Sequence, residues 1–397
     1  MNDNRRDFIK KSASVAASLS IGTMDALATG THKRKEKTDD SLNGRKEKIN
    51  YIKDAGMKLC VAYFAGKEPR RIALAKQMEV LGAVGGIDPK MVGMDNTNNW
   101  EFDVIKAVKE SWDKEGLKLT VIEGPPSLNT KTKLGLPGKD EEIANFITLM
   151  KNMSQLGIDT ICYNWMPLIS WARSDKAMPD RGGALVMGFD IDKMEGDPIT
   201  EYGKLTHDLM WKNLEYFLKA VVPEAEKYGI KLSMHPDDPP VDAIRGVPRI
   251  MTSVAAFKRL IDIYPSPNNG ITWDGTFGEM GDKGKQEDLP AAMEYFGKKN
   301  VITFVHFRNV RGYRQHFNET FIDDGQMDMA RLMQILYDTG YKGPLRPDHV
   351  PTMAGDSNSF PGYSTIGTLF AIGYIRGLID AARGTTLTEK KRGNSFI

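Results

Sequence analysis

The stretch that decides the fold is Lys231-Leu-Ser-Met-His-Pro-Asp-Asp-Pro-Pro240. It opens with a short apolar run of the kind that forms a buried strand. Pro236 and Pro239 lack a backbone N–H donor and therefore end the strand, which places His235 at its carboxyl end. Barrel and open-sheet enzymes carry their chemistry at this end of their strands. The stretch therefore predicts an α/β fold with functional residues at the carboxyl ends of its strands.

Three later stretches repeat this design, and each ends in a candidate metal ligand. They are Gly270-Ile-Thr-Trp-Asp-Gly275, Val301-Ile-Thr-Phe-Val-His-Phe-Arg308 and Gly343-Pro-Leu-Arg-Pro-Asp-His349. A single histidine at a strand end is more often structural, but four polar residues at four consecutive strand ends are harder to dismiss. We therefore expect a metal site of two imidazoles and two carboxylates: His235, Asp274, His306 and Asp348. Such a mixed set suits Mn²⁺, Zn²⁺ or Fe²⁺ better than Ca²⁺.

Strand and helix patterns alternate along the chain from residue 57. The eight predicted strands cover residues 58–65, 82–87, 117–123, 159–165, 230–235, 270–274, 301–307 and 345–349. Eight such repeats predict a (β/α)₈ TIM barrel, with a doubly wound sheet as the alternative. Residues 171–203 lack a clear period, so we expect a long loop insertion after the fourth strand, over the active-site face. A disordered surface excursion is the alternative for this segment.

The N-terminal residues have the features of an export signal. Asn4-Arg5-Arg6-Asp7-Phe8-Ile9-Lys10 resembles the twin-arginine motif, an apolar run follows, and Ala26-Leu27-Ala28 resembles a cleavage site. We expect residues 1–28 to be a twin-arginine signal peptide, residues 29–50 a flexible linker, residues 51–385 the barrel and residues 386–397 a tail. The expected location is the periplasm, with no stable membrane span in the mature chain. A basic, disordered tail is the alternative reading of these first residues.

Composition limits the classes of partner. The 397 residues carry a formal net charge of +2, which gives no reason to expect a nucleic-acid partner. The two cysteines, Cys60 and Cys162, are too few for a disulfide framework and lie in apolar strands, where buried free thiols are expected. The composition leaves a homo-oligomer open.

A set of short motifs resembles one enzyme family. In chain order they are Tyr163-Asn164-Trp165-Met166-Pro167, His235-Pro-Asp-Asp-Pro-Pro240, Val247-Pro-Arg-Ile250, His306-Phe-Arg-Asn309, Phe317-Asn-Glu319, Asp328-Met329, Arg346-Pro-Asp-His349 and Pro361-Gly-Tyr363. With these motifs the chain resembles the metal-dependent mannonate dehydratases, whose fold is a xylose-isomerase-like barrel. The resemblance runs from about Met57 to Asp380. It implies that a small sugar acid, D-mannonate, loses water to give 2-keto-3-deoxy-D-gluconate.

The resemblance also implies a metal-ligand set, from which this chain departs at one position. The family holds its metal with His, Cys, His and Asp, and three of these match His235, His306 and Asp348. The family's cysteine aligns with Asp274. A carboxylate is a harder donor than a thiolate, so the change should favour Mn²⁺ or Mg²⁺ over Zn²⁺. We expect a divalent metal, Mn²⁺ first, with Fe²⁺, Mg²⁺ and Zn²⁺ as alternatives.

Four further residues are candidates for chemistry and substrate binding. The resemblance assigns proton transfer to His349 and Tyr363. Arg308 follows His306 by two residues, so on a strand it would point the same way and could bind a sugar-acid carboxylate. A structural ion pair is the alternative for Arg308. Asn164 is a candidate for contact with substrate hydroxyls.

Two other functions remain open from the sequence. One is a metal-dependent sugar or sugar-acid isomerase or epimerase on the same barrel, and the other is a non-catalytic sugar-acid binding protein. The change at Asp274 and the apparent export signal leave room for the isomerase or epimerase, whereas retention of His349 and Tyr363 argues against a non-catalytic binding protein.

Overall fold

The computed structural model describes residues 53–125, 127–194 and 196–393. The predicted export signal (1–28) and linker (29–50) lie outside the described residues.

Eight parallel strands close into a barrel, which confirms the predicted fold and excludes the doubly wound sheet. Around the barrel each strand is hydrogen-bonded to two neighbours, in the order β1-β16-β13-β10-β7-β4-β3-β2. The strands are β1 (Lys58–Ala62), β2 (Gly82–Gly85), β3 (Lys118–Glu123), β4 (Thr160–Tyr163), β7 (Lys231–Met234), β10 (Asn269–Trp273), β13 (Ile302–Phe307) and β16 (Pro344–Pro347). Every predicted barrel strand therefore corresponds to one in the structure, with ends that differ by a few residues.

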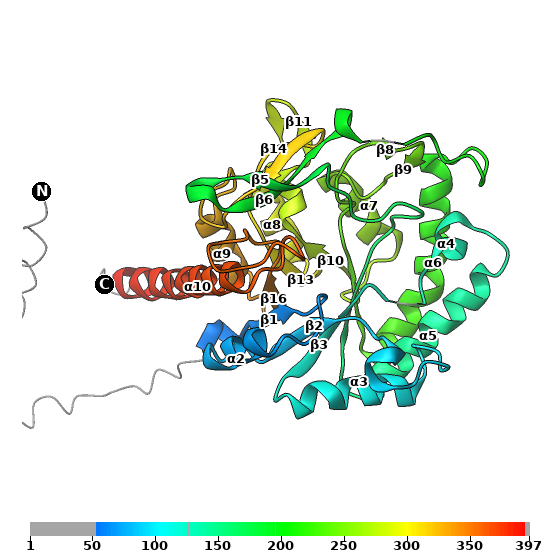
Figure 1. The fold of residues 1–397 in the computed structure, drawn as a ribbon, viewed down its shortest axis with the longest axis horizontal. Coiled ribbons are helices and arrows are strands. Elements are labelled where there is room, and N and C mark those ends of the chain that lie inside the picture. Colours follow the sequence, from blue (N-terminus) through cyan, green and yellow to red (C-terminus); the bar gives the residue numbers. More distant parts are fainter. Residues whose placement is uncertain (1–52, 126, 195, 394–397) are drawn as a thin grey trace, which may run out of the picture. The chain divides into compact units, whose positions relative to one another are not determined.

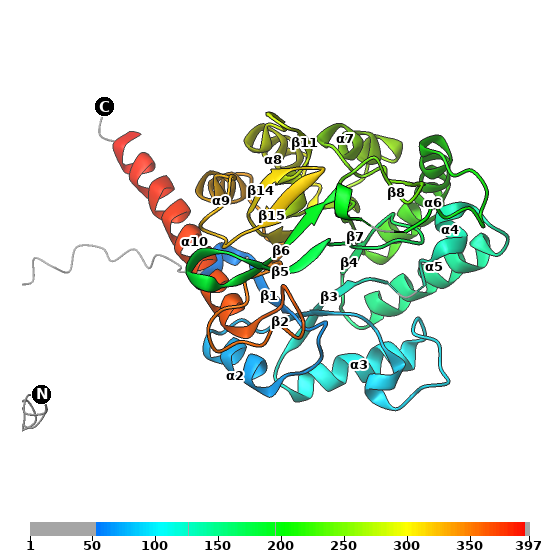
Figure 2. The ribbon, with the colours of Figure 1, turned by 45° about the horizontal axis from the view of Figure 1, so that its top comes forward.

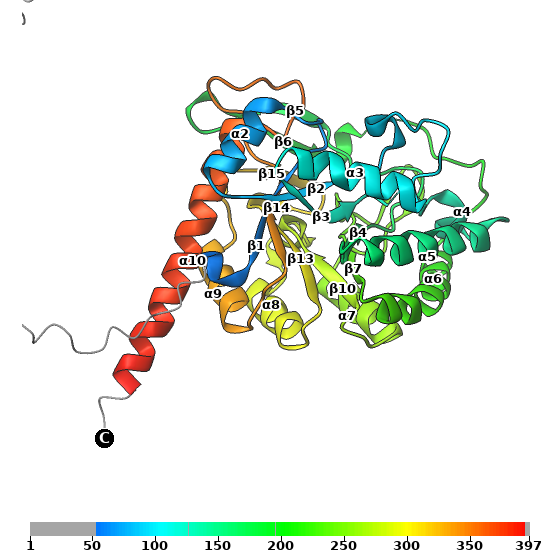
Figure 3. The ribbon, with the colours of Figure 1, turned by 90° about the horizontal axis from the view of Figure 1, so that it is seen from below.

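Helices surround the strands on the outside of the barrel (Figures 1 and 3). They are α2 (Pro69–Gln77), α3 (Phe102–Lys114), α4 (Thr130–Leu134), α5 (Lys139–Gln155), α6 (His207–Tyr228), α7 (Val254–Ile263), α8 (Leu289–Lys298), α9 (Met329–Asp338) and α10 (Thr365–Gly393). Several begin at a side-chain cap that satisfies a free backbone N–H. The Asp328 side chain, for example, accepts a 2.9 Å hydrogen bond from Arg331 N at the start of α9. The Asp328-Met329 motif therefore has a structural explanation.

The segment after β4 is more than the predicted loop. It contains β5 (Asp175–Pro179) and β6 (Leu185–Asp190), which join β14 (Val310–Tyr313) and β15 (His316–Glu319) in an antiparallel sheet of order β14-β15-β6-β5. Figure 2 shows these two segments side by side, although they are far apart in the sequence. The prediction of a loop was wrong in this respect, because β6 pairs with a strand more than a hundred residues later and local periodicity cannot reveal such pairing. The other short pairs are β8 (Ala243–Ile244) with β9 (Val247–Pro248) and β11 (Gly281–Asp282) with β12 (Lys285–Gln286).

Helix α10 closes the barrel and continues past its predicted end. The sequence predicted a tail from residue 386, but the helix runs to Gly393, since the intervening residues include no proline and several good helix formers. Within α10, Thr365–Gly384 is long and apolar enough to cross a membrane by length and composition alone. Its buried residues, Ala371, Ile372, Ile375 and Ile379, belong to the main apolar core. This packing is typical of the core helix of a barrel.

Candidate active site

The four predicted metal ligands meet at the carboxyl ends of their strands. His235 follows β7, Asp274 follows β10, His306 lies near the end of β13 and Asp348 follows β16. Asp274 Oδ2 lies 3.4 Å from His235 Nε2 and 2.9 Å from His306 Nδ1. Asp348 Oδ1 lies 3.8 Å from His306 Nδ1. The structure thus brings together residues that the sequence spreads over more than a hundred positions.

Local hydrogen bonds orient two of these ligands. His235 Nδ1 lies 2.7 Å from the carbonyl oxygen of Pro236, so this nitrogen donates and leaves Nε2 to face Asp274. Asp274 Oδ1 accepts hydrogen bonds from the backbone N–H and hydroxyl of Thr276, which leaves Oδ2 for the two imidazoles. Burial alone would lower the pKa of His235, but the charge of Asp274 outweighs it and raises this pKa to about 9. Asp274 therefore acts as a negatively charged neighbour of both imidazole rings.

Arg308 is fully buried beside this cluster and is surrounded by carboxylates. Its guanidinium lies within hydrogen-bond or ion-pair distance of five of them: Glu279 (2.6 Å), Asp348 (2.7 Å), Asp274 (3.1 Å), Asp238 (3.3 Å) and Glu319 (3.6 Å). Gly275 makes this approach feasible, because a Cβ at that position would lie 2.8 Å from Arg308 Cβ. The guanidinium is thus taken up by protein carboxylates, which favours the alternative of a structural ion pair over substrate contact.

The charges of the buried side chains indicate whether this cluster can bind a cation. Carboxylates outnumber guanidiniums in this buried site. The three guanidiniums of Arg173, Arg308 and Arg346 face six carboxylates, those of Glu123, Asp238, Asp274, Glu279, Glu319 and Asp348. Burial, together with the nearby Asp238, raises the pKa of Glu279 to about 8 in spite of its contact with Arg308. His306 Nε2 is buried without a hydrogen-bond partner. The surplus of carboxylates over guanidiniums and the imidazole and hard oxygen donors of the cluster together fit a divalent cation.

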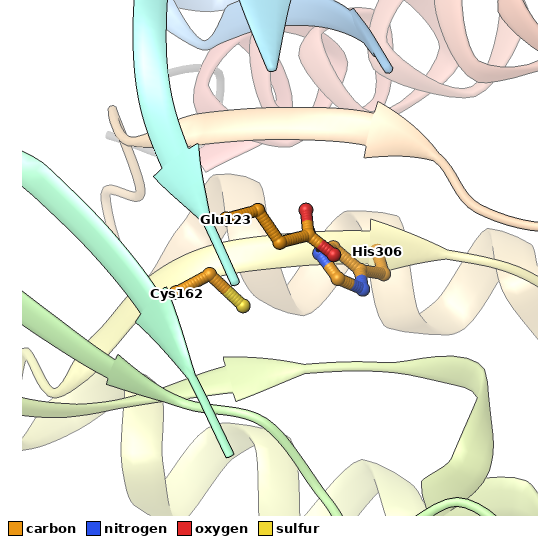
Figure 4. Close-up of side chains that lie close together, drawn as sticks. All are labelled: Glu123, Cys162 and His306. Carbon is orange, nitrogen blue, oxygen red and sulfur yellow. Dashed lines mark ion pairs between the residues drawn. The ribbon is translucent and has the colours of Figure 1, made fainter. Parts of the chain in front are cut away.

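Sequence analysis missed Glu123 and gave Arg346 no role. Glu123 ends β3 and points toward His306, with Cys162 of β4 beside it (Figure 4). Arg346 donates from Nη2 to Glu123 Oε1 at 3.0 Å and from Nη1 to Asp348 Oδ1 at 2.8 Å. Burial would raise the pKa of Glu123, but the charge of Arg346 outweighs it and lowers this pKa to about 2. The strand-end rule that identified Asp274 could have identified Glu123, since Gly124 and Pro125 end its strand.

A cavity of about 530 Å³ opens onto the cluster. This volume lies within the roughly 300–1,000 Å³ of small-molecule sites. The predicted residues Asn164, His235, Asp348, His349 and Tyr363 line it, whereas Asp274, His306 and Arg308 do not. The other lining side chains include the aromatic residues Phe64, Trp171 and Phe360 and the cations Lys176 and Arg346. Asn164 Oδ1 accepts hydrogen bonds from Lys133 Nζ at 2.9 Å and Met166 N at 3.1 Å, so its side chain is held in place.

His349 and Tyr363 share one wall of the cavity, with ring centroids 5.4 Å apart. His349 Nδ1 lies 2.7 Å from Glu319 Oε1 in β15. Glu319 is held in turn by Arg173, which donates to Glu319 Oε1 at 2.6 Å and to Asp238 Oδ1 at 2.6 Å. Desolvation raises the pKa of the Tyr363 phenol well above its usual value. The site therefore presents an oriented imidazole beside a phenol that keeps its proton at neutral pH.

The chain is similar in sequence to mannonate dehydratases. The family model described as D-mannonate dehydratase (UxuA) matches residues 57–202 and 197–389. The mannonate dehydratase of Streptococcus equi subsp. zooepidemicus is 32% identical over 352 residues, which cover 82% of this chain and 94% of that protein. Mannonate dehydratase 2 of Halalkalibacterium halodurans is 32% identical over 353 residues, which cover 82% of this chain and 99% of that protein.

Solved structures give the same result. The crystal structure of mannonate dehydratase from Streptococcus suis superimposes with a TM-score of 0.75 at 34% identity, and the match covers 83% of this chain and 94% of that one. A D-tagatose 3-epimerase-like protein matches with a TM-score of 0.51 at 16% identity over 83% of this chain and 100% of that one. At that identity the second likeness shows the shared xylose-isomerase-like barrel and nothing about activity.

Proposed function

The chain belongs to the D-mannonate dehydratase family, and we propose that it is a metal-dependent hydro-lyase that converts D-mannonate to 2-keto-3-deoxy-D-gluconate and water. The observation that carries this proposal is the strand-end cluster of two imidazoles and two carboxylates beside the oriented His349. The reaction requires removal of a proton next to a carboxylate and departure of a hydroxide from the adjacent carbon. These steps need a Lewis acid, a base and an acid.

We infer that the resident metal is Mn²⁺. His235, Asp274, His306 and Asp348 would hold it. Asp274 Oδ2 lies within 3.4 Å of a nitrogen of each imidazole, and one donor atom from each of these three residues lies within 4.8 Å of the other two. When bound, a divalent cation would act as a Lewis acid toward the substrate carboxylate and a hydroxyl. The carboxylate at Asp274 supports a harder metal than the family's cysteine would.

His349 and Tyr363 are suited to opposite proton-transfer roles. The Glu319 carboxylate accepts a hydrogen bond from His349 Nδ1, so that Nε2 is left as the nitrogen that can take a proton from the substrate. Tyr363 retains its proton and can donate it to the departing hydroxide. We therefore propose that His349 is the base and Tyr363 the acid.

Asn164 and Arg346 are the proposed substrate-binding residues. Both line the cavity, and the Arg346 guanidinium lies between the metal ligand Asp348 and Glu123. A guanidinium at this position can stabilise the substrate carboxylate. Asn164, held by Lys133, can meet a substrate hydroxyl.

Product analysis tests this function. The full chain, stripped of metal and reloaded with Mn²⁺, is expected to form a 2-keto-3-deoxy acid from D-mannonate, and His306→Ala is expected to form none. Absence of this product in the Mn²⁺-loaded protein would eliminate D-mannonate as the substrate. Formation of a sugar-acid isomer without loss of water would instead favour an isomerase.

We also propose that the protein is exported by the twin-arginine route to the periplasm. The support is the order of motif, apolar run and cleavage-like site in residues 4–28. In cell fractions, the native chain should appear in the periplasm, and replacement of Arg5 and Arg6 by lysines should retain it in the cytoplasm. An unchanged distribution in this variant would disprove the route.

A further inference from the structure

Glu123, Cys162 and His306 form a second group of potential metal ligands in the mouth of the barrel. They come from β3, β4 and β13, and their side chains point toward one another (Figure 4). One ligand atom from each lies within 4.8 Å of the other two. The proposed reaction uses neither Glu123 nor Cys162. Their convergence on a proposed metal ligand therefore requires its own explanation.

The two nitrogens of His306 face different groups. Nδ1 lies 2.9 Å from Asp274 Oδ2, a distance that requires a proton on this nitrogen when Asp274 is a carboxylate. Arg346 Nη2 also lies 3.2 Å from Nδ1, but it has a closer acceptor in Glu123 Oε1 at 3.0 Å. With its proton on Nδ1, the neutral ring directs the lone pair of Nε2 away from Asp274.

The lone pair of His306 Nε2 faces a lone pair of Glu123 Oε2. Nε2 of the fully buried His306 faces Glu123 Oε2 at 3.5 Å, and neither atom has a hydrogen-bond partner. The distance is longer than the roughly 2.7–3.2 Å of an N–H···O hydrogen bond, so a proton between the two atoms does not account for it. Two buried acceptors that face each other are stabilised when a cation lies between them.

Asp274 and His306 have the arrangement that supports such a cation. A histidine that binds a metal through one nitrogen commonly donates its other N–H to a carboxylate. Asp274 is such a carboxylate for His306, because it accepts the Nδ1–H and leaves Nε2 free to bind a metal. The third side of the gap is formed by Cys162 Sγ, whose contact within the protein is Thr272 Oγ1 at 3.4 Å. Sulfur there makes the set softer than the His235–Asp274–His306–Asp348 set.

We propose that Glu123 Oε2, Cys162 Sγ and His306 Nε2 form a second cation position, which binds soft divalent metals such as Zn²⁺. Three protein ligands and a water complete the tetrahedral shell that Zn²⁺ prefers. The two positions exclude each other, because the Mn²⁺ position needs the lone pair of Nδ1 and the second needs its proton. A soft metal bound there therefore removes His306 from the Mn²⁺ set.

Co²⁺ alone, added to the metal-free full chain, tests the proposal. Bound thiolate gives Co²⁺ a near-ultraviolet charge-transfer band, which we expect in the wild type and not in Cys162→Ser. Cys60→Ser is the matched control, since Cys60 is equally buried in the barrel but belongs to neither ligand group of the described residues. Absence of the band in the wild type, or its persistence in Cys162→Ser, would overturn the proposal.

A second measurement needs no variant and so does not depend on whether Cys162→Ser folds. X-ray absorption of the Zn²⁺-loaded wild type should show one sulfur at about 2.3 Å from the metal. A first shell of nitrogen and oxygen only would overturn the proposal. Neither readout depends on turnover of D-mannonate, so the second position can fail while the dehydratase function stands, and the reverse also holds.

Discussion

Asp274 stands where the family resemblance led us to expect a cysteine. The structure gives it four contacts that a thiolate could not reproduce together: two hydrogen bonds from Thr276, an ion pair with Arg308 and a 2.9 Å contact with His306. Burial would raise the pKa of Asp274, but the charge of Arg308 outweighs it and holds this pKa well below its usual value. The surrounding groups therefore stabilise the charged carboxylate form of Asp274.

Restoring the family's residue should change the metal preference. In Asp274→Cys, a softer donor replaces a harder one, so the ratio of Zn²⁺ affinity to Mn²⁺ affinity should rise by about tenfold or more. Competitive titration of the metal-free protein with the two ions measures this ratio. Asp274→Asn is the control, since it removes the charge without adding sulfur and should weaken both ions. An unchanged ratio in Asp274→Cys would show that residue 274 does not set metal choice.

Glu319 should act on turnover through His349. Because its Oε1 lies 2.7 Å from His349 Nδ1 and Glu319 does not line the cavity, Glu319→Gln should lower kcat and leave KM nearly unchanged. The expected loss is about 10–100-fold, a part of the 10²–10⁴ that a positioned proton-transfer group supplies. Steady-state kinetics with D-mannonate measure both constants. A rise in KM at constant kcat would instead indicate a binding role.

The same carboxylate should make stability depend on pH. Burial would raise the pKa of Glu319, but His349 and Arg173 outweigh it and lower the pKa to about 2. In the unfolded chain this pKa is about 4.3, so the stabilisation is complete above that value and is lost as the pH falls toward 2. The difference in unfolding free energy between wild type and Glu319→Gln, measured in urea, should narrow from about pH 6 to about pH 3. A pH-independent difference would contradict this assignment.

At the scale of elements, the segment after β4 is joined to the barrel by one buried arginine. Arg173 contacts Asp238, which follows β7, and Glu319 in β15, and all three are buried. In addition, β6 pairs with β15, and β5 pairs with β6. Through these contacts the insertion, the antiparallel sheet and the His349 wall of the cavity form one connected unit.

Removing this arginine should cost far more than removing an exposed one from the same insertion. Arg173→Ala leaves two buried carboxylates without their partner, and we expect the unfolding free energy to fall by about 3–5 kcal/mol. Arg181 pairs with Asp323 at 3.0 Å but is 42% exposed, so Arg181→Ala should cost no more than about 1 kcal/mol. Urea denaturation compares the two variants. Equal losses would show that burial of the Arg173 pairs does not matter.

At the scale of the whole molecule, the residues of the proposed Mn²⁺ position come from four different strands of the closed barrel, so we expect metal binding and folding to be coupled. A metal ion at about 100 times its Kd stabilises the folded state by about 2.7 kcal/mol. Mn²⁺ should therefore raise the Tm of the metal-free protein by a few degrees in a thermal scan. His306→Ala should show no such rise, and a similar rise in that variant would place the stabilising ion elsewhere.

The sequence by itself determined the barrel, because each strand is a local apolar run and the predicted metal ligands lie at or just after the ends of these runs. Proline and glycine at the ends of these runs placed His235, Asp274 and Asp348 at the same edge. Pairing between neighbouring parallel strands then brings them together with no further information. For these features local sequence and overall fold agree.

Only the tertiary structure decided which groups these residues face. The pairing of β6 with β15, the five carboxylates around Arg308 and the contact of Glu123 and Cys162 with His306 all join segments far apart in the chain. A side chain's partners depend on distances of a few ångström across the barrel, and spacing along one strand does not contain them. For that reason the sequence pointed to Arg308 as a substrate ligand, whereas the fold surrounds it with protein carboxylates.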